Sequence, residues 1–194
     1  MGVMVQATVK KSGWNESLLV CDIHTGTHLD APFHFLDDGK TVDQIPLETF
    51  MGETLVIDLT SKKAKEIISA PDLQKYDESV RKYRKVLLNT GWSAHFGKED
   101  KPDYYTEFPE LDMGAAEWFA DRQVLLLGMD FPAPSNRWND DVHRLLFRRG
   151  TLVIIENMTN LGALRNSVVN LVALPLKYKG REGSQIRAIA IEDS

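Results

Sequence analysis

The chain has 194 residues, of which 43% are hydrophobic and 26% are charged, and its net charge is -5. This length and composition favour a single ordinary globular domain that spans residues 1–194. The acidic balance argues against a surface for nucleic acid or for an anionic membrane, because both would need a basic patch.

Cysteine usage and the apolar runs bear on the compartment. Cys21 is the single cysteine, which excludes an internal disulfide and fits a reducing compartment. The first residues lack the basic start and the long apolar segment of a signal peptide. The longest apolar runs, such as residues 152–155, are far too short to cross a bilayer. We therefore predict a cytoplasmic protein without a membrane partner.

Short apolar runs bounded by turn signals predict buried strands along the chain. The first run, at residues 18–21, leads directly into a stretch rich in histidine. Helix starts are predicted at Pro71 with Asp72, at Asp112, and at Asp140 or Asp141. Later strands are expected at residues 55–59, 86–88, 124–127, 152–155, 168–174 and 186–191. About seven or eight strands against three or four helices indicate an α/β or α+β fold.

Three of the five histidines and one aspartate lie in the stretch that follows the first predicted strand. Their positions are separated by even numbers of residues, so in an extended strand all four side chains point to one face. A helix is disfavoured because a glycine, two threonines and a proline interrupt the stretch. Imidazole and carboxylate are suitable ligands for zinc, manganese or iron. The sequence therefore predicts a strand that stops at Pro32 and carries candidate ligands, namely His24, His28, Asp30 and His34.

A metal site also needs ligands from elsewhere in the chain, and the candidates are His143 and Glu156. His143 lies on the helix expected after Asp140 or Asp141. Glu156 directly follows four apolar residues, so its carboxylate would emerge at the edge of the core. Burial of an unpaired carboxylate costs free energy, and a bound cation is one way to offset that cost. The alternative is an ordinary exposed glutamate at the end of a strand.

The histidine-rich stretch resembles the HxGTHxDxPxH signature of the cyclase family, which includes the bacterial kynurenine formamidases and the isatin hydrolases. The matching residues are His24, Gly26, Thr27, His28, Asp30, Pro32 and His34. Other similar stretches are residues 89–92, Gly128 and Asp130 with residues 134–135, His143 through residues 156–157, and residues 174–176 with Gly183 and Arg187. The resemblance covers residues 18–192, which is nearly the whole chain.

The resemblance implies a swivelling β/β/α domain, a compact α/β layer or barrel-like sheet with peripheral helices, that forms homodimers or homotetramers. It also implies a centre for one or two divalent ions, for which zinc and manganese are both suitable. His34 would be the catalytic acid/base residue and not a ligand. The ligands would share Asp30 and Glu156 between the ions, with His24, His28 and Asp30 holding one ion, and Asp30, His143 and Glu156 holding a second.

Two features depart from the family pattern. One residue more than usual separates His143 from Glu156, and we expect it to lie harmlessly in the turn at residues 148–150. The part before His24 is shorter than usual, and in the family this part contributes an aromatic residue to the substrate pocket. In this chain, Trp14 or a residue of a partner subunit would take the place of that aromatic residue in the wall of the substrate pocket. Trp92 would also stack on an aromatic substrate, although a place in the core is an equal expectation.

The implied function is hydrolysis of an amide C–N bond by metal-activated water, with a small molecule as substrate. The substrate would be an aryl formamide, like N-formylkynurenine, or a cyclic amide, like isatin. A histidine suits the proton transfer to the departing nitrogen because its ordinary pKa is about 6.5. Two alternatives stay open, namely an inactive family member that binds a metal or ligand, and a structural domain without metal. The presence of His34 beside five candidate ligands favours the enzyme, because a binding protein needs no proton shuttle.

Overall fold

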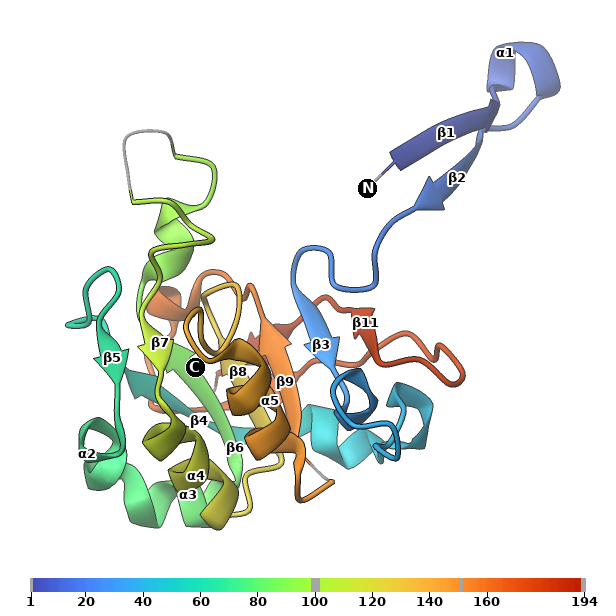
Figure 1. Ribbon diagram of the computed structural model, residues 1–194. Helices are drawn as coiled ribbons and strands as arrows, with labels where there is room; N and C mark the ends of the chain where they lie inside the picture. The colour runs from blue at the N-terminus through green and yellow to red at the C-terminus, as the bar shows by residue number, and fades with distance from the viewer. Residues whose placement is uncertain (1, 99–101, 151, 193–194) are drawn as a thin grey trace.

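The computed structural model describes residues 2–98, 102–150 and 152–192 and is built around one eight-stranded sheet (Figure 1). From one edge to the other its strands are β11 (Gly183–Gln185), β3 (His28–Asp30), β9 (Val153–Glu156), β8 (Leu126–Met129), β6 (Lys85–Asn89), β4 (Met51–Asp58), β10 (Val168–Val172) and β12 (Ile189–Ile191). The four central strands run parallel, and antiparallel strands extend the sheet at both edges. The predicted fold class, a mixed α/β sheet with peripheral helices, is confirmed.

Helices connect the parallel strands and cover one face of the sheet (Figure 1). They are α2 (Ala70–Leu73) and α3 (Asp77–Tyr83) before β6, α4 (Met113–Asp121) before β8, and α5 (Asn139–Phe147) before β9. The larger hydrophobic core lies between these helices and the sheet, and Leu88, Phe119, Phe147 and Ile154 are fully buried in it. Within the described ranges, no helix combines the length and the apolarity of a membrane span.

A second, smaller core lies on the opposite face of the sheet. Short 3-10 segments cover it, namely η2 (Val42–Gln44), η3 (Leu47–Phe50) and η6 (Leu161–Ala163). Along β3 and β9, Leu29 and Ile155 point into this smaller core. Because side chains alternate between the faces of a strand, the neighbouring His28, Asp30 and Glu156 point toward the face that carries α5.

Most strands lie where apolar runs predict them, but the described residues contain twelve strands, more than the seven or eight expected. The additional strands are short or pair outside the main sheet, as β5 (Ile67–Ile68) does with β7 (Glu110–Leu111). Asp112 caps α4 as predicted, because its carboxylate accepts a backbone N–H at 2.7 Å. The predicted cap at Asp140 or Asp141 is wrong. Both carboxylates lie inside the first turn of α5, where they favourably face the positive end of the helix dipole.

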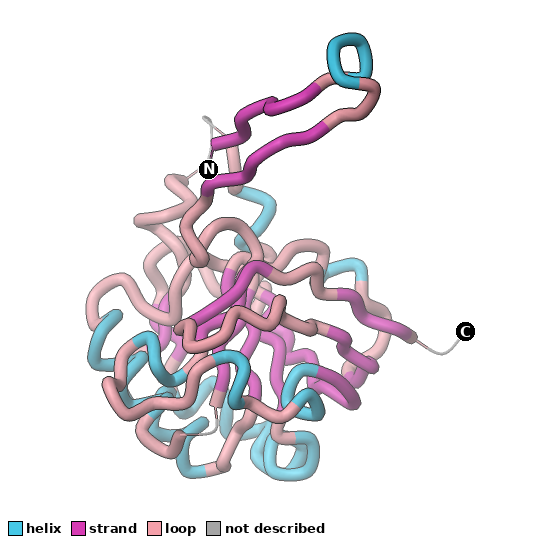
Figure 2. The backbone as a smooth tube through the Cα atoms, turned by 90° about the vertical axis from the view of Figure 1, so that its right-hand side faces the viewer, coloured by secondary structure: helices cyan, strands magenta, loops and turns pink. Residues whose placement is uncertain are grey.

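The N-terminal segment extends from the body as a separate hairpin (Figure 2). β1 (Gly2–Ala7) and β2 (Glu16–Val20) pair with each other and with no other described strand, and α1 (Val9–Ser12) lies in their connection. The prediction of a buried strand at residues 18–21 is therefore wrong, since Leu19 and Val20 are each 57% exposed. The apolar run does form a strand, but no part of the described chain covers it.

Candidate metal centre

The histidine-rich stretch does not form one continuous strand. His24 lies in a turn in which Gly26 has a left-handed backbone, with φ 70°, and β3 begins only at His28. The proline at the end of the stretch begins the 3-10 helix η1 (Pro32–His34). The prediction that all four side chains share one strand face is thus wrong for His24 and His34. The left-handed glycine reverses the chain before β3, and the short helix turns it again afterwards, so both histidines return to the same place.

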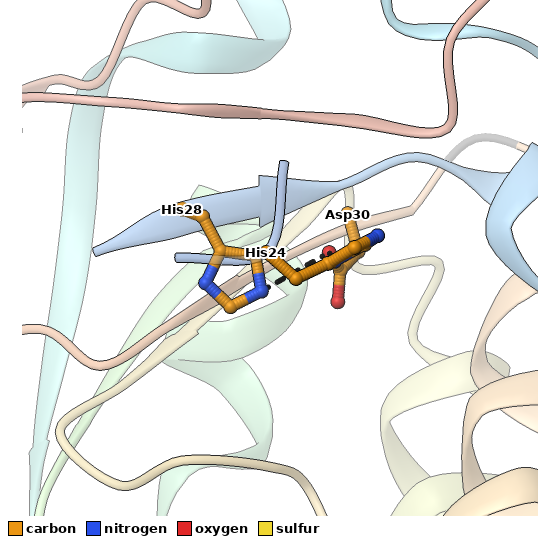
Figure 3. Close-up of side chains that lie close together, drawn as sticks. All are labelled: His24, His28 and Asp30. Carbon is orange, nitrogen blue, oxygen red and sulfur yellow. Dashed lines mark ion pairs between the residues drawn. The ribbon is translucent and has the colours of Figure 1, made fainter. Parts of the chain in front are cut away.

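Asp30 lies at the centre of the cluster, and its side chain is almost completely buried. His24 Nδ1 is 2.7 Å from Asp30 Oδ1, and His28 Nε2 is 3.4 Å from the same oxygen. Figure 3 shows the three side chains together on and beside β3, where dashed lines mark ion pairs between the histidines and the Asp30 carboxylate. These residues form one group whose ligand atoms all lie within 4.8 Å of one another.

His143 and Glu156 form a second group around the same aspartate. His143, on α5, places Nε2 3.8 Å from Asp30 Oδ2 and 3.4 Å from Glu156 Oε1. Glu156, at the end of β9, places Oε2 3.4 Å from His28 Nε2 in the first group. The additional residue between His143 and Glu156 therefore does not keep them apart. The structure brings all five predicted ligand residues together, in two groups that share Asp30.

Backbone carbonyls orient two of the imidazole rings. The Nδ1–H of His28 donates to the carbonyl of Gly26 at 2.9 Å, and the Nδ1–H of His143 donates to the carbonyl of Asn139 at 2.9 Å. A carbonyl can only accept, so in each ring Nδ1 carries the hydrogen and a neutral ring has its lone pair on Nε2. Both Nε2 atoms face the carboxylates, which is the arrangement expected of metal-binding histidines.

Three buried atoms of the cluster have no hydrogen-bond partner among the described residues, namely His28 Nε2, Asp30 Oδ1 and His143 Nε2. The approach of His24 Nδ1 to Asp30 Oδ1 therefore lacks the angles of a hydrogen bond despite its short distance. An unpaired buried polar atom costs about 1–3 kcal/mol, which a shared cation would remove. Two atoms each about 2.1 Å from a zinc ion, at the tetrahedral angle, stand about 3.4 Å apart. Three nitrogen–oxygen distances in the cluster are 3.4 Å, so these residues fit a divalent metal ion.

Protons take the place of the cation in the metal-free cluster. Burial alone would raise the pKa of Asp30, but the histidines around it hold that pKa well below its usual range. Burial and the charge of Asp30 raise the pKa of Glu156. Burial also opposes charge on His28 and His143, yet the two carboxylates raise the pKa of each histidine to about 9. At neutral pH both histidines are protonated, so a metal ion must displace protons in order to bind.

His34 lies beside the two ligand groups and belongs to neither. Its ring stacks on that of His24, with centroids 4.1 Å apart and an interplanar angle of 28°. It meets the ring of His143 edge-on, with centroids 5.9 Å apart. Burial lowers the pKa of His34 from its ordinary value. The imidazole is therefore neutral at pH 7 and able to accept a proton next to the candidate metal centre.

The structure does not bring the two tryptophans of the predicted substrate wall into the cluster. Trp92 is only 3% exposed and belongs to the larger core, where its ring stacks on that of His95 with centroids 4.1 Å apart. Its Nε1–H donates to the carbonyl of Tyr104 at 2.9 Å. Trp14 is 60% exposed and lies in the connection between α1 and β2, at the end of the hairpin away from the body (Figure 1).

Sequence reasoning misses two residues that border the cluster. Phe35 stacks on the ring of His143, with centroids 4.4 Å apart and an interplanar angle of 18°. Glu182 places Oε1 4.0 Å from Nε2 of His24. Phe35 directly follows the histidine-rich stretch, and this position is a usable signal. Glu182 comes from the turn before β11, and its local sequence carries no such signal.

Known proteins resemble the chain in both sequence and structure. Kynurenine formamidase from Bacillus cytotoxicus is 33% identical over 188 residues, which cover 95% of this chain and 84% of that protein. The enzyme of the same name from Bacillus thuringiensis subsp. konkukian is 32% identical over 177 residues, which cover 90% of this chain and 79% of that protein. Isatin hydrolase A from Ralstonia solanacearum has a TM-score of 0.81 at 25% identity, over 97% of this chain and 80% of that one.

The names of these relatives are those of amidohydrolases, so the predicted enzyme class is confirmed. A further solved structure, described as a potential metal-dependent hydrolase with cyclase activity, has a TM-score of 0.77 at 28% identity, over 97% of this chain and 85% of that one. The Cyclase family model matches residues 5–135, which contain the whole histidine-rich stretch. The chain belongs to the cyclase family.

Proposed function

We propose that the protein is a metal-dependent amidohydrolase that cleaves the C–N bond of an aryl formamide, such as N-formylkynurenine, or of a cyclic amide, such as isatin. The carrying observation is that two groups of metal-binding side chains share the buried Asp30 while the neutral His34 stands beside them. The substrate class is drawn from the names of the relatives, a kynurenine formamidase and an isatin hydrolase.

The proposed cofactor is one or two zinc or manganese ions. His24, His28 and Asp30 would hold one ion, and Asp30, His143 and Glu156 would hold a second. Glu156 would also be available to the first ion, because its Oε2 is 3.4 Å from His28 Nε2. When bound, such a cation lowers the pKa of water and polarises an amide carbonyl.

His34 performs the proton transfer in this proposal. The neutral imidazole accepts a proton from the water whose oxygen attacks the carbonyl carbon. It then gives that proton to the amide nitrogen as the C–N bond breaks, so that an aryl formamide yields an amine and formic acid, while a cyclic amide opens to one molecule that carries both the amine and the carboxylic acid. The lowered pKa of His34 leaves the ring unprotonated at the start of this cycle, as a base must be.

We also propose that the protein acts as a homodimer or a higher homo-oligomer. Val3 and Leu19 are neighbours on one face of the hairpin, and Met4 and Leu18 are neighbours on the other. All four side chains are exposed. A two-stranded hairpin is at best marginally stable alone in water, and an apolar surface of this extent is typical of a protein interface.

A second copy of this chain is the proposed partner of the hairpin. The stem of the hairpin borders a groove of about 540 Å³, whose lining is mostly apolar or neutral, with Lys179 and Arg181 as its charged residues. Apolar contact, and not charge, would therefore hold a second hairpin there. Gln185, which also lines the groove, pairs with His28 across β3 and β11, so the groove borders the strand that carries two of the candidate ligands. A second hairpin in this groove would cover the more exposed side of the centre, at His24, and would bring Trp14 to the other copy.

The function is tested with the purified protein, loaded separately with zinc and with manganese. Hydrolysis is measured on N-formylkynurenine, isatin and simple cyclic amides, and the metal content of each sample is determined in parallel. Turnover of an aryl formamide or of isatin, lost on chelation and restored by the metal, is expected. Bound metal without hydrolysis of any amide would favour the inactive binding protein, and metal below about 0.1 equivalent would favour a structural domain.

A further inference from the structure

Asn157, the residue after Glu156, has a left-handed backbone with φ 57°. Asparagine tolerates this conformation better than most other residues, because its short polar side chain forms local hydrogen bonds. Its N–H donates to the carbonyl of Phe131 at 3.1 Å, just beyond the end of β8. The left-handed turn therefore ends β9 directly after the carboxylate of Glu156 and holds the chain against the neighbouring strand.

Thr27 binds Asn157 from the other side. Its hydroxyl donates to the carbonyl of Asn157 at 2.6 Å. Thr27 directly precedes His28, and His28 pairs with Glu156 across β3 and β9. This hydrogen bond therefore closes the ends of the two strands immediately beside two candidate metal ligands.

Tyr104 supplies a third contact, from the long loop before β7. Its phenol donates to Oδ1 of Asn157 at 3.0 Å, and its side chain is almost completely buried. Trp92 fixes the same residue through the hydrogen bond from its Nε1–H to the Tyr104 carbonyl. The rings of Phe96 and Tyr105 pack edge-on against the ring of Tyr104. The loop is thus held around Tyr104, and the Tyr104 phenol connects it to Asn157.

We propose that Asn157 is a positioning residue that fixes Glu156 against His28 and connects the metal centre to the loop that carries Tyr104. This inference rests on the proposed function. Neither Asn157 nor its partners Thr27 and Tyr104 belong to the two ligand groups, so they act through the ligands. Loss of a direct hydrogen-bond partner of a ligand typically lowers metal affinity about 10-fold to 100-fold, and residues that act one contact further out should have a smaller effect.

The variants for the test remove one contact each. Thr27→Val replaces the hydroxyl by a methyl group, Asn157→Gly removes Oδ1 while still allowing the left-handed backbone, and Tyr104→Phe removes the phenol hydrogen bond. The matched control is Thr54→Val in β4, because Thr54 is fully buried and its hydroxyl donates to the carbonyl of Gly52 at 2.9 Å, outside the cluster. Thr27→Ser restores the hydroxyl and serves as the rescue.

Two readouts are measured on the wild-type protein and on each variant, namely zinc affinity by competition with a chelator and the visible absorption spectrum of bound Co²⁺. We expect Thr27→Val and Asn157→Gly to bind zinc up to about 10-fold more weakly, which is the lower end of the range for a direct partner of a ligand, and to change the Co²⁺ spectrum. Tyr104→Phe should change both in the same direction, Thr27→Ser should match the wild type, and Thr54→Val should lower only the melting temperature.

Unchanged affinity and an unchanged Co²⁺ spectrum in both Thr27→Val and Asn157→Gly would overturn the positioning role while leaving the proposed function intact. An equal loss of affinity in Thr54→Val would also overturn it, because the effect would then be general destabilisation. A wild-type protein that binds no divalent cation would overturn the proposed function and this role together.

Discussion

His28 and Glu156 face each other across the β3–β9 pair, and this register places His28 Nε2 3.4 Å from Glu156 Oε2. Strand pairing thus brings His28, a candidate ligand near the start of the chain, next to Glu156, a candidate ligand near its end. Because both residues are fixed by the sheet and not by a mobile loop, their separation is set before any cation binds. The candidate metal centre is in this sense a product of the fold.

Asp30→Asn tests the aspartate that both ligand groups share. The substitution keeps the shape of the side chain and removes its negative charge from between three histidines. We expect metal affinity to fall by more than about 100-fold, because the loss of an outer partner alone lowers it about 10-fold to 100-fold. Competition with a chelator measures the change.

The matched control for this variant is Asp112→Asn, since asparagine caps a helix about as well as aspartate does. Asp112 caps α4 and is not a member of either ligand group. The Asp112→Asn variant should bind metal as the wild type does. If Asp30→Asn and the wild type bound the metal with equal affinity, Asp30 would not be a ligand.

Metal binding should release protons at neutral pH. In the metal-free protein the pKa of His28 and that of His143 are both about 9, so both rings are protonated at pH 7. A cation binds only the neutral rings, and its apparent affinity should therefore rise as the pH increases from 7 toward 9. Titration calorimetry in buffers of different ionisation enthalpy counts the protons released. Absence of proton release at pH 7 would contradict the expectation that two protonated histidines lose their protons to the ion.

Leu19→Glu tests the hairpin as the interface between two copies. The side chain is 57% exposed in the single chain, so the substitution should not unfold the protein, but it would place a charge inside the proposed interface. Light scattering is expected to give at least twice the chain mass of 21.9 kDa for the wild type and the single-chain mass for the variant.

Leu47→Glu is the control for the hairpin variant, because Leu47 is a similarly exposed leucine, at 60%, in η3 of the body. It should leave the oligomer intact. A monomeric wild type at the concentrations used for activity would contradict the role of the hairpin.

The sequence predicts which candidate ligand residues the structure brings together, but it predicts their local structure less well. Imidazole and carboxylate side chains are recognisable wherever they stand, so His24, His28 and Asp30 can be picked out without coordinates. The route by which His24 reaches Asp30 depends on the left-handed turn at Gly26. Periodicity along the chain treats that glycine only as a residue that disfavours a helix, and so predicts one long strand.

Apolar composition predicts burial only where another part of the described chain covers the apolar run. Apolar runs such as that of β9 are buried as expected, because α5 and the sheet cover them. The run in β2 is also apolar, yet its side chains are exposed in the single chain.

Sequence reasoning also gives Trp92 two possible places, and its burial within the larger core decides between them.

His34→Ala tests most directly whether His34 moves protons while other residues hold the metal. Metal content and turnover are measured on the same sample of the variant and of the wild type. We expect the variant to retain its metal and to lose about 10²-fold to 10⁴-fold in rate, the range that general acid–base catalysis contributes, with partial recovery when free imidazole is added. Undiminished hydrolysis, or loss of the metal together with activity, would contradict this division of roles.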